Sequence, residues 1–469
     1  MSEANRREFL RTSGALLGGI AVGTQVTAAT RTDRFVVQTK GKQTPSDLDI
    51  VHEMSGVKFV VVEGTESAVE DSKAVTDYAA DIEVELDAPD ANDDVPAFDK
   101  SDYEGQPGDF LQWDKDDLGV PTAHETTEGE GTRVAVIDSG VLETHPDLAG
   151  PLDLELSRNF TDDGGDHNPV EGDDHGTHVA GIVAADNGGG VGVNGTAPKT
   201  DLVDCRVFSG PTASFADILA AVVYSANVDA DVANLSLGAY PIPRQGLGKF
   251  YGKVLNSIMT YANKEGTLLV VAAGNDSADL QHDKNFISLP NEGAQAVSVS
   301  ATGPIGCGWD ADEDDETSDF DDPPESPAFY TNYGTNAITL GAPGGDADLD
   351  AIGTGVPCFY DLVFNTVFTY EDGDDDDEEP EQVPGWGWKA GTSMAAPNVA
   401  GAAALVKSAD EDLNANQVES VLKRTAEVPD DYEKTYYGAG YLDVVAAVDE
   451  AASDDDDNED GNGNNGNGK

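Results

Sequence analysis

Apolar residues between positions 109 and 450 follow two alternating patterns. Short, nearly continuous apolar runs are typical of strands buried on both faces of a sheet, whereas apolar residues at every third or fourth position are typical of helices. The expected strands are residues 133–137, 201–207, 232–237, 267–273 and 296–301. The expected helices are residues 176–185, 214–226, 247–265, 393–408 and 415–426. This alternation predicts an α/β fold, a doubly wound, mostly parallel sheet with helices on both faces.

A smaller unit precedes this one, over residues 31–105. Residues 34–38 and 57–62 are apolar runs typical of strands, and residues 82–86 alternate apolar and acidic side chains. The stretch between the last two strands has the composition of a short helix. We therefore expect a small α+β domain, which ends in a linker rich in Pro and Asp at residues 88–107.

The two ends of the chain have the composition of segments outside a folded core. Residues 1–30 combine the pair Arg6-Arg7 with a short apolar run and small residues, which predicts a signal peptide of the twin-arginine type. The apolar run is too short to span a membrane. Residues 453–469 contain a run of Asp followed by Gly and Asn repeats, so we expect a disordered acidic tail. The large unit then occupies residues 106–452.

The chain carries 26 Lys and Arg against 90 Asp and Glu, a net charge of −64. Nucleic acids and anionic membranes repel such a surface, which argues against both as partners. Concentrated salt relieves the self-repulsion, since the Debye length falls from about 10 Å at 0.1 M to about 3 Å at 1 M. Two acidic inserts, residues 310–326 and 371–381, are interpreted as solvated loops, but acidic residues recur along the whole chain. We therefore interpret the surface as adapted to a salty medium.

Three cysteines, Cys205, Cys307 and Cys358, form neither a disulfide framework nor a Cys-x-x-Cys metal motif. Cys205 lies in an apolar stretch and is expected to be a buried strand thiol. If the protein is exported, Cys307 and Cys358 either pair or remain free, and the residues leave both options open.

Two polar residues stand where a buried strand ends and a helix begins. Asp138 directly follows the first expected strand, at the carboxyl edge where open α/β sheets place their active sites. His175 opens a helix within His-Gly-Thr-His-Val-Ala-Gly, which suits a general base whose second nitrogen faces a carboxylate. A turn cap is the simpler interpretation of Asp138. His178 lies on another face and is expected to pack, because no third ligand follows at metalloprotease spacing.

Ser393 opens the helix that begins within Gly-Thr-Ser-Met-Ala-Ala-Pro. Free backbone N–H groups and the positive end of the helix dipole lie beside such a hydroxyl, although an N-cap is the simpler interpretation. The small residues around it leave room for a substrate. Asn275 ends a strand within Ala-Ala-Gly-Asn, where its amide either faces an oxyanion or caps a turn.

Together these four motifs resemble those of the subtilisin-like serine proteases, including the order Asp, His, Ser along the chain. They span most of residues 110–450. With the acidic composition and the paired arginines, the chain is most similar to the halolysin-type extracellular subtilases of halophilic archaea. It departs from them in the two acidic inserts and in a short tail that replaces a folded C-terminal domain.

The resemblance implies a serine endopeptidase that hydrolyses protein or peptide substrates through an acyl-enzyme. Ser393 would attack, His175 would carry the proton and Asp138 would orient the imidazole. The Asn275 amide and the Ser393 N–H would hold the oxyanion.

The resemblance also implies two backbone walls around the substrate's P1 side chain. Their small residues predict broad specificity with an apolar P1. The wall residues are Ser236, Leu237, Gly238, Ala272, Ala273 and Gly274.

A structural Ca²⁺ ion is also implied by the resemblance. Its expected ligands are Asp147, within His-Pro-Asp-Leu, and Asn187, in the glycine-rich loop 186–193, with Gln112 as a further candidate. The loop is one residue longer than the usual family pattern.

The resemblance implies that residues 31–105 form a pro-segment that inhibits the enzyme from within the same chain. We expect a secreted, monomeric zymogen without a membrane span, which cleaves itself between residues 97 and 109. A non-catalytic peptide-binding relative and an esterase with the same triad are the alternatives. No catalytic position is substituted, and the strand-pairing cleft segments favour peptides.

Overall fold

The computed structural model describes residues 29–41, 44–85, 108–170, 173–245, 247–306, 322–347, 358–371 and 381–462. Residues 1–28 of the expected signal peptide, the linker and most of both acidic inserts lie outside these residues, as does Cys307, whereas residues 29 and 30 belong to the first strand of the structure. The possible pairing of Cys307 with Cys358 is therefore not described. Cys205 is fully buried in a strand, as expected.

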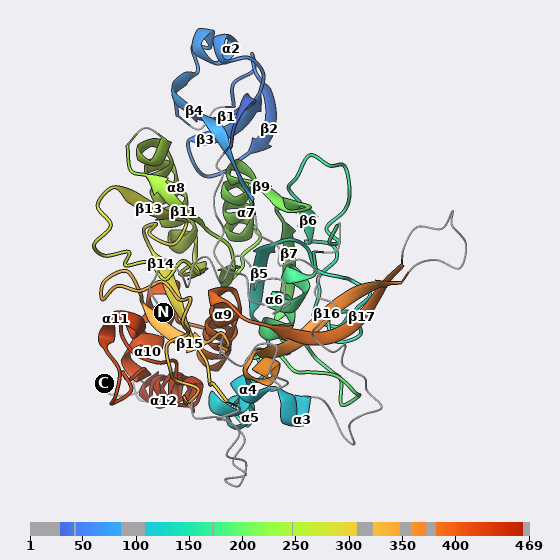
Figure 1. Cartoon of the computed structure of the whole chain (residues 1–469). Coiled ribbons are helices and arrows are strands. Elements are labelled where there is room, and N and C mark those ends of the chain that lie inside the picture. The colour runs from blue at the N-terminus through green and yellow to red at the C-terminus, as the bar shows by residue number, and fades with distance from the viewer. Residues whose placement is uncertain are drawn as a thin grey trace, which may run out of the picture.

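A seven-stranded parallel sheet forms the centre of the larger domain (Figure 1). Each neighbouring pair of its strands runs parallel. In spatial order the strands are β15 (Leu340–Pro343), β14 (Ala296–Thr302), β12 (Leu268–Ala272), β10 (Val232–Leu235), β5 (Arg133–Asp138), β7 (Asp201–Arg206) and β6 (Arg158–Asn159). The chain leaves β5 for β7 on one side and later returns to β10 on the other. The strand order therefore reverses between β5 and β10, where α/β sheets bind their ligands.

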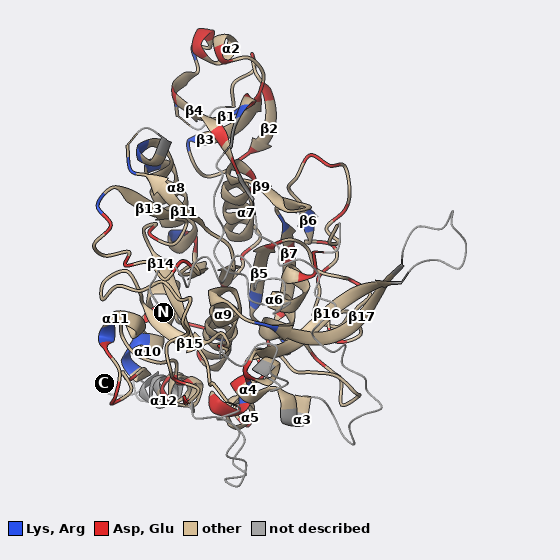
Figure 2. Cartoon of the chain, viewed as in Figure 1, with Lys and Arg blue, Asp and Glu red and all other residues tan. Residues whose placement is uncertain are grey.

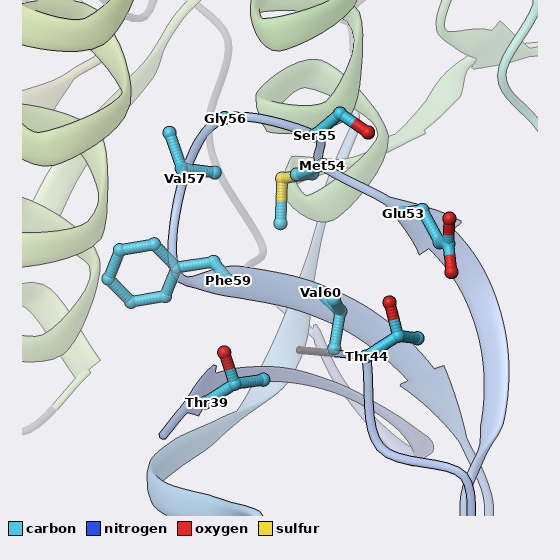
Figure 3. Close-up of a pocket in the computed structure, with 9 residues that line it drawn as sticks. All are labelled: Thr39, Thr44, Glu53, Met54, Ser55, Gly56, Val57, Phe59 and Val60. Atoms are coloured by element: carbon cyan, nitrogen blue, oxygen red, sulfur yellow. The ribbon is translucent and has the colours of Figure 1, made fainter. Parts of the chain in front are cut away.

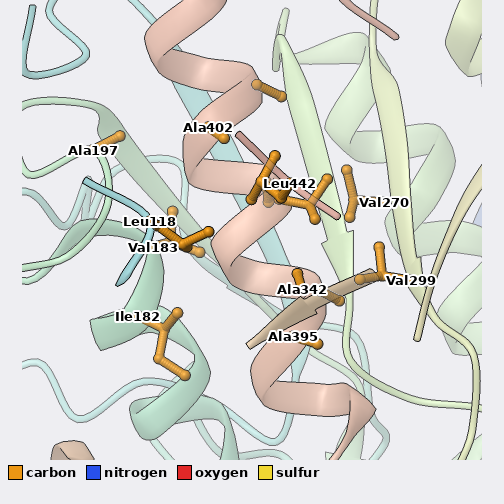
Figure 4. Packing of buried hydrophobic residues seen from close by; sticks show 14 of the residues in the cluster. Leu118, Ile182, Val183, Ala197, Val270, Val299, Ala342, Ala395, Ala402 and Leu442 are labelled. Atoms are coloured by element: carbon orange, nitrogen blue, oxygen red, sulfur yellow. The ribbon is translucent and has the colours of Figure 1, made fainter. Parts of the chain in front are cut away.

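Alternate residues of each strand face two separate cores. Val134 and Val136 pack with helices α6 (His175–Ala184) and α9 (Thr392–Ala409), whereas Ala135 packs with α7 (Phe215–Asn227) and α8 (Leu247–Glu265). Figure 4 shows the first core, where small residues of α9 approach strand residues such as Val270. Helices thus cover both faces of the sheet, which confirms the predicted fold class.

The structure contains all ten strands and helices expected in the larger domain, with ends within two residues of those expected. One of the ten is α10 (Ala415–Thr425). Further short helices, none of them expected, are α3 (Gly108–Leu111), α4 (Trp113–Asp117), α5 (Val120–Ala123), α11 (Lys434–Tyr437) and the 3-10 helix η2 (Cys358–Asp361). The short helices are too brief to show a periodic pattern.

Two antiparallel pairs of strands were missed. Strands β11 (Ala239–Pro243) and β13 (Phe286–Leu289) pair across a long connection, and β16 (Val363–Glu371) pairs along its length with β17 (Glu381–Lys389). The hairpin of β16 and β17 extends from the body of the molecule (Figure 1). Its two strands flank the acidic run that we interpreted as an insert, and that run obscured their alternation.

The prediction of a disordered tail is wrong for residues 453–462. Helix α12 (Val444–Asn462) continues through them, and residues 463–469 lie outside the described chain. The first two turns of α12 bury Val444, Ala447, Val448 and Ala451. A helix started by such packing adds turns without a new nucleation cost, which a composition argument does not capture.

The N-terminal unit is a separate α+β domain, drawn in blue in Figure 1. Its elements are β1 (Ala29–Thr39), β2 (Asp49–Glu53), β3 (Phe59–Glu63), α2 (Glu66–Asp71) and β4 (Val75–Glu85). Its sheet continues into the larger domain, because β4 pairs with β9 (Thr212–Ser214), and β9 in turn pairs with β8 (Phe208–Ser209). The two domains therefore share one six-stranded sheet.

Candidate active site

Asp138 and His175 form a hydrogen-bonded pair at the carboxyl edge of the central sheet. Asp138 is the last residue of β5 and is fully buried, and its Oδ1 lies 2.7 Å from His175 Nδ1. The Ser139 N–H donates to the same oxygen at 2.8 Å. The close approach requires Gly176, because a Cβ atom there would lie 2.5 Å from the Gly140 carbonyl oxygen. The pair expected from the sequence is therefore formed.

The charge of Asp138 determines the protonation of the imidazole. Burial lowers the pKa of His175, but the charge of Asp138, its hydrogen bond and the charge of Asp173 outweigh burial and raise that pKa. A raised pKa makes His175 a stronger proton acceptor. His178 differs: burial lowers its pKa well below the ordinary value, and its Nε2 lies 3.2 Å from the Val363 carbonyl oxygen. The expectation that His178 packs is confirmed.

Ser393 lies next to the end of β10, the strand beside β5. It is the second residue of α9, and its carbonyl accepts a hydrogen bond from Ser236 Oγ at 2.8 Å. Because β10 lies beside β5 and Ser236 directly follows β10, Ser393 lies at the same edge of the sheet as Asp138. The Ser393 hydroxyl donates to the Ser236 carbonyl at 3.2 Å, so it has to rotate toward the imidazole before attack.

Asn275 and the Ser393 N–H approach one point in front of Gly391. Asn275 Oδ1 accepts hydrogen bonds from the Thr392 N–H at 2.9 Å and from the Thr392 hydroxyl at 2.8 Å, so its Nδ2 is turned to the other side. A Cβ atom placed on Gly391 would lie 3.4 Å from Asn275 Nδ2 and 3.6 Å from Ser393 N. Two N–H donors that converge in this way can stabilise a developing oxyanion.

The two expected cleft walls follow adjacent parallel strands. Residues 236–238 come directly after β10, and residues 272–274 cover the end of β12 and the two residues beyond it. Behind them, Ala239 pairs with Leu289, and Asn291 Nδ2 donates to the Ala273 carbonyl oxygen at 3.5 Å. The walls are therefore tied together at their base by the segment that follows β13.

The expected calcium ligands are hydrogen-bonded to protein groups, beginning with Asp147. Asp147 is 2% exposed, and its Oδ2 accepts hydrogen bonds from the Val193 N–H at 3.0 Å and from Trp386 Nε1 at 2.7 Å. A Cβ on Gly192 would lie 2.4 Å from both carboxylate oxygens, so the loop fills the space in front of them. The part of the chain that is described also contains no group of three His, Cys, Asp or Glu side chains arranged for a metal ion.

The other two candidate ligands are also engaged by protein groups. Asn187 Oδ1 accepts a hydrogen bond from the Gly189 N–H at 2.8 Å. Gln112 Oε1 accepts one from the Asn194 N–H at 3.0 Å. Protein N–H donors thus occupy oxygens that a cation would need, and calcium binding here stays a prediction.

Sequence reasoning missed several residues around the site. Thr392 orients Asn275, Asp173 lies beside the imidazole, and Lys389 Nζ binds Asp174 Oδ1 at 2.7 Å. Thr392 and Asp173 stand within two residues of recognised motif positions, so their proximity was a usable signal. The Lys389–Asp174 pair had none, because 215 positions separate the two residues.

A small cavity of about 50 Å³ lies elsewhere, in the N-terminal domain (Figure 3). Met54, Val57, Phe59 and Val60 are among its lining residues. None of the catalytic candidates lines it, so it is separate from the site. Among the described helices, none is both long and apolar enough to cross a membrane.

The fold and this arrangement of Asp, His, Ser and Asn define a class of serine hydrolase, and comparison with known proteins agrees with it. The model of the subtilase family, Peptidase_S8, matches residues 129–463. The chain belongs to the subtilase family and is a serine endopeptidase.

Two relatives and one solved structure illustrate the likeness. The chain is 31% identical to Subtilisin Savinase of Lederbergia lenta over 72% of its own length and 98% of that protein's. It is 29% identical to the Thermophilic serine proteinase of Bacillus sp. (strain AK1), over 65% of its own length but only 59% of that protein's. The structure of the epidermin leader peptide processing serine protease of Staphylococcus aureus matches 89% of this chain, with a TM-score of 0.66 and 20% identity. At that identity the structural match supports the fold alone.

Proposed function

We propose that this protease is exported as a zymogen and cleaves peptide bonds with Ser393, His175, Asp138 and Asn275. One observation carries the assignment of these residues: the hydrogen-bonded Asp138–His175 pair lies at the end of β5, and the Asn275 amide and the Ser393 N–H lie near one point at the same edge of the sheet. In a site built this way, each group has one role in acyl transfer.

In the proposed reaction, His175 Nε2 takes the proton of Ser393 Oγ as that oxygen attacks the peptide carbonyl. The carbonyl oxygen becomes negative and is held by Asn275 Nδ2 and the Ser393 N–H. Asp138 keeps Nδ1 protonated and stabilises the imidazolium, which then protonates the leaving amine. Water enters, His175 takes its proton, and the acyl-enzyme is hydrolysed.

Reaction with a serine-directed phosphonylating reagent tests this assignment. We expect stoichiometric labelling of the mature protein and none of Ser393→Ala, with casein hydrolysed far better than a short-chain ester. The same assays in dilute buffer and in molar KCl test the salt dependence. Labelling that persists in Ser393→Ala would contradict the assignment, and preference for the ester would favour the esterase alternative.

The small side chains of the two cleft walls support broad specificity with an apolar P1 residue. In this proposal the substrate lies between the two walls as an added strand. The net charge of −64 supports a salt-adapted surface, and Figure 2 shows acidic positions on α2, around α4 and along several loops. Together with the paired arginines, this surface supports export into a saline medium by the twin-arginine route, as in the halolysin-type enzymes.

The proposed pro-segment is supported by its contacts with the larger domain. Strand β4 pairs with β9, and Asp81 of β4 accepts hydrogen bonds from Ser214 Oγ at 2.6 Å and from the Ala216 N–H at 3.1 Å. Asp81 thereby caps the start of α7. The buried Arg34 bonds to Asp81 and Asp217. In this proposal the shared sheet holds the domain in place until self-cleavage between residues 97 and 109 releases it.

A further inference from the structure

Asp173 is a second carboxylate beside the catalytic imidazole. It lies two residues before His175, and its Oδ1 accepts a hydrogen bond from the His175 N–H at 3.1 Å. Its Oδ2 is buried and has no hydrogen-bond partner among the described residues. Its carbonyl oxygen accepts a hydrogen bond from Ser139 Oγ at 3.4 Å, which holds the segment next to Asp138. Because a buried carboxylate without a full set of donors is costly, it is expected to have a compensating positive charge nearby.

The positive charge available to it is the imidazolium. Charged and titratable groups act on the imidazole from four segments: Asp138 from β5, Asp173 from the loop before α6, His178 from α6 itself, and Lys389, which also binds Asp174, from the end of β17. His178 is kept neutral by burial, which lowers its pKa. The charge of Lys389 opposes protonation of the imidazole, but Lys389 also binds Asp174. Asp138 and Asp173 are therefore the two negative groups that favour the imidazolium.

We propose that Asp173 is a positioning residue, which holds the His175 backbone through Oδ1 and stabilises the imidazolium with the charge on Oδ2. The inference rests on the proposed function, in which His175 gains the Ser393 proton. Asp173 acts through the imidazole and touches neither the substrate nor the reacting atoms. The mutual effect on pKa agrees with this geometry: Asp173 raises the pKa of His175, and although burial raises the pKa of Asp173 itself, the charge of His175 opposes that rise.

The substitution Asp173→Asn removes the charge and keeps an acceptor for the His175 N–H. A catalytic histidine must be neutral to act as a base, so lowering its pKa extends activity to lower pH. We expect the acidic limb of the pH profile of kcat/KM to shift to lower pH by about 0.5 to 1 unit. Plateau kcat should fall several-fold while KM is unchanged. Lys389→Gln should move the limb in the opposite direction, because it removes a positive charge beside the imidazole and leaves Asp174 unpaired.

The matched control is Asp166→Asn, which removes one negative charge from an exposed position before the same helix. All variants are measured in 1 M and 3 M KCl, where the Debye length is about 3 Å or less, so that the long-range field of the acidic surface is screened. The shift for Asp173→Asn should persist at both salt concentrations, and Asp166→Asn should show none. The pH dependence of the rate at which the reagent phosphonylates Ser393 gives the same acidic limb without a peptide substrate.

The inference is overturned if Asp173→Asn keeps the wild-type limb, or if Asp166→Asn shifts it equally. Rates are expressed per phosphonylated site, so a fraction of unfolded protein does not alter them. If Asp173→Asn does not fold, Asp173→Ser and the opposite shift of Lys389→Gln decide the question. Activity that survives in Ser393→Ala would instead refute the proposed function, so the two failures are distinguishable.

Discussion

Thr392 illustrates how a single side chain sets the geometry of the oxyanion site. Its hydroxyl accepts a hydrogen bond from the Gly274 N–H at 3.0 Å and donates to Asn275 Oδ1 at 2.8 Å. An amide held by its oxygen in this way has one orientation, and its N–H donors are directed to the opposite side. Thr392 therefore orients the amide that holds the substrate's oxyanion in the proposed reaction.

At this scale we expect Thr392→Val to lower kcat about 10-fold with little change in KM, because it removes one hydrogen bond of roughly 1 kcal/mol that orients the donor. Asn275→Ala should cost more, about 10²- to 10³-fold in kcat, the loss typical of an oxyanion-hole donor. Steady-state kinetics on a peptide amide checks both. Equal losses in the two variants would mean that Thr392 does more than orient Asn275.

At the scale of elements, the β16–β17 hairpin connects the site to the loop where calcium was expected. Its Trp386 donates to Asp147, its Gly385 carbonyl oxygen lies 2.9 Å from His145 Nε2, and its Lys389 binds Asp174. The strand that carries these contacts ends two residues before Gly391. The hairpin thus fixes the approach to α9, which the sequence pattern did not reveal.

These contacts predict the response to chelation. Because N–H donors already bond to Asp147, removing calcium with a chelator should lower Tm by less than about 2 °C, whereas loss of a tightly bound ion would lower it far more. Trp386→Phe should destabilise the protein by about 1 to 2 kcal/mol, since it leaves a buried carboxylate oxygen with one donor fewer. Thermal unfolding with and without chelator measures both. A large chelator effect would establish calcium binding as the sequence led us to expect.

The packing of α9 gives a second prediction for elements. A Cβ atom on Gly401 would lie 2.5 Å from Thr196 Cβ, so Gly401→Ala should destabilise the protein by about 1 to 3 kcal/mol. Gly252, in α8, has no atom within 4 Å of such a Cβ, and Gly252→Ala should be stabilising by about 0.5 to 1 kcal/mol. Denaturant unfolding of the two variants compares them directly. Similar effects of the same sign would show that contact with Thr196 does not limit the size of the side chain at position 401 of α9.

For the whole molecule, the contact between the two domains depends on a buried ionic cluster. Arg34, Asp81 and Asp217 are each at most 2% exposed, and His52 Nε2 lies 2.7 Å from Asp217 Oδ1. Burial raises the pKa of Asp81 to about 6, while its bond to Ser214 and the charge of Arg34 oppose this. The folded chain therefore favours protonated Asp81. Because the unfolded chain loses this proton at a lower pH, the free energy of unfolding falls as the pH rises from about 4 to about 6.

We therefore expect Asp81→Asn to change the pH dependence of stability. One oxygen of Asp81 accepts from Ser214 Oγ and the other from the Ala216 N–H, so asparagine keeps one of the two acceptors and cannot ionise. In a full-length Ser393→Ala background, which prevents self-cleavage in the proposed mechanism, Asp81→Asn should gain stability relative to Asp81 between pH 4 and about 6. Thermal unfolding across this range measures the difference. A constant difference would mean that Asp81 ionises as readily in the folded chain as in the unfolded one.

By itself, the sequence determined the α/β architecture and predicted the candidate catalytic residues, because apolar periodicity and short motifs are local properties of the chain. Asp138, His175 and Ser393 each stand where a strand ends or a helix begins, and parallel strands carry such positions to one edge. Only the tertiary structure decided what surrounds them. The donors on Asp147, the Lys389–Asp174 pair and the unpartnered oxygen of Asp173 depend on burial and on contacts between distant segments. Electrostatic energies vary with distance and solvent exposure in three dimensions, and separation along the chain specifies neither.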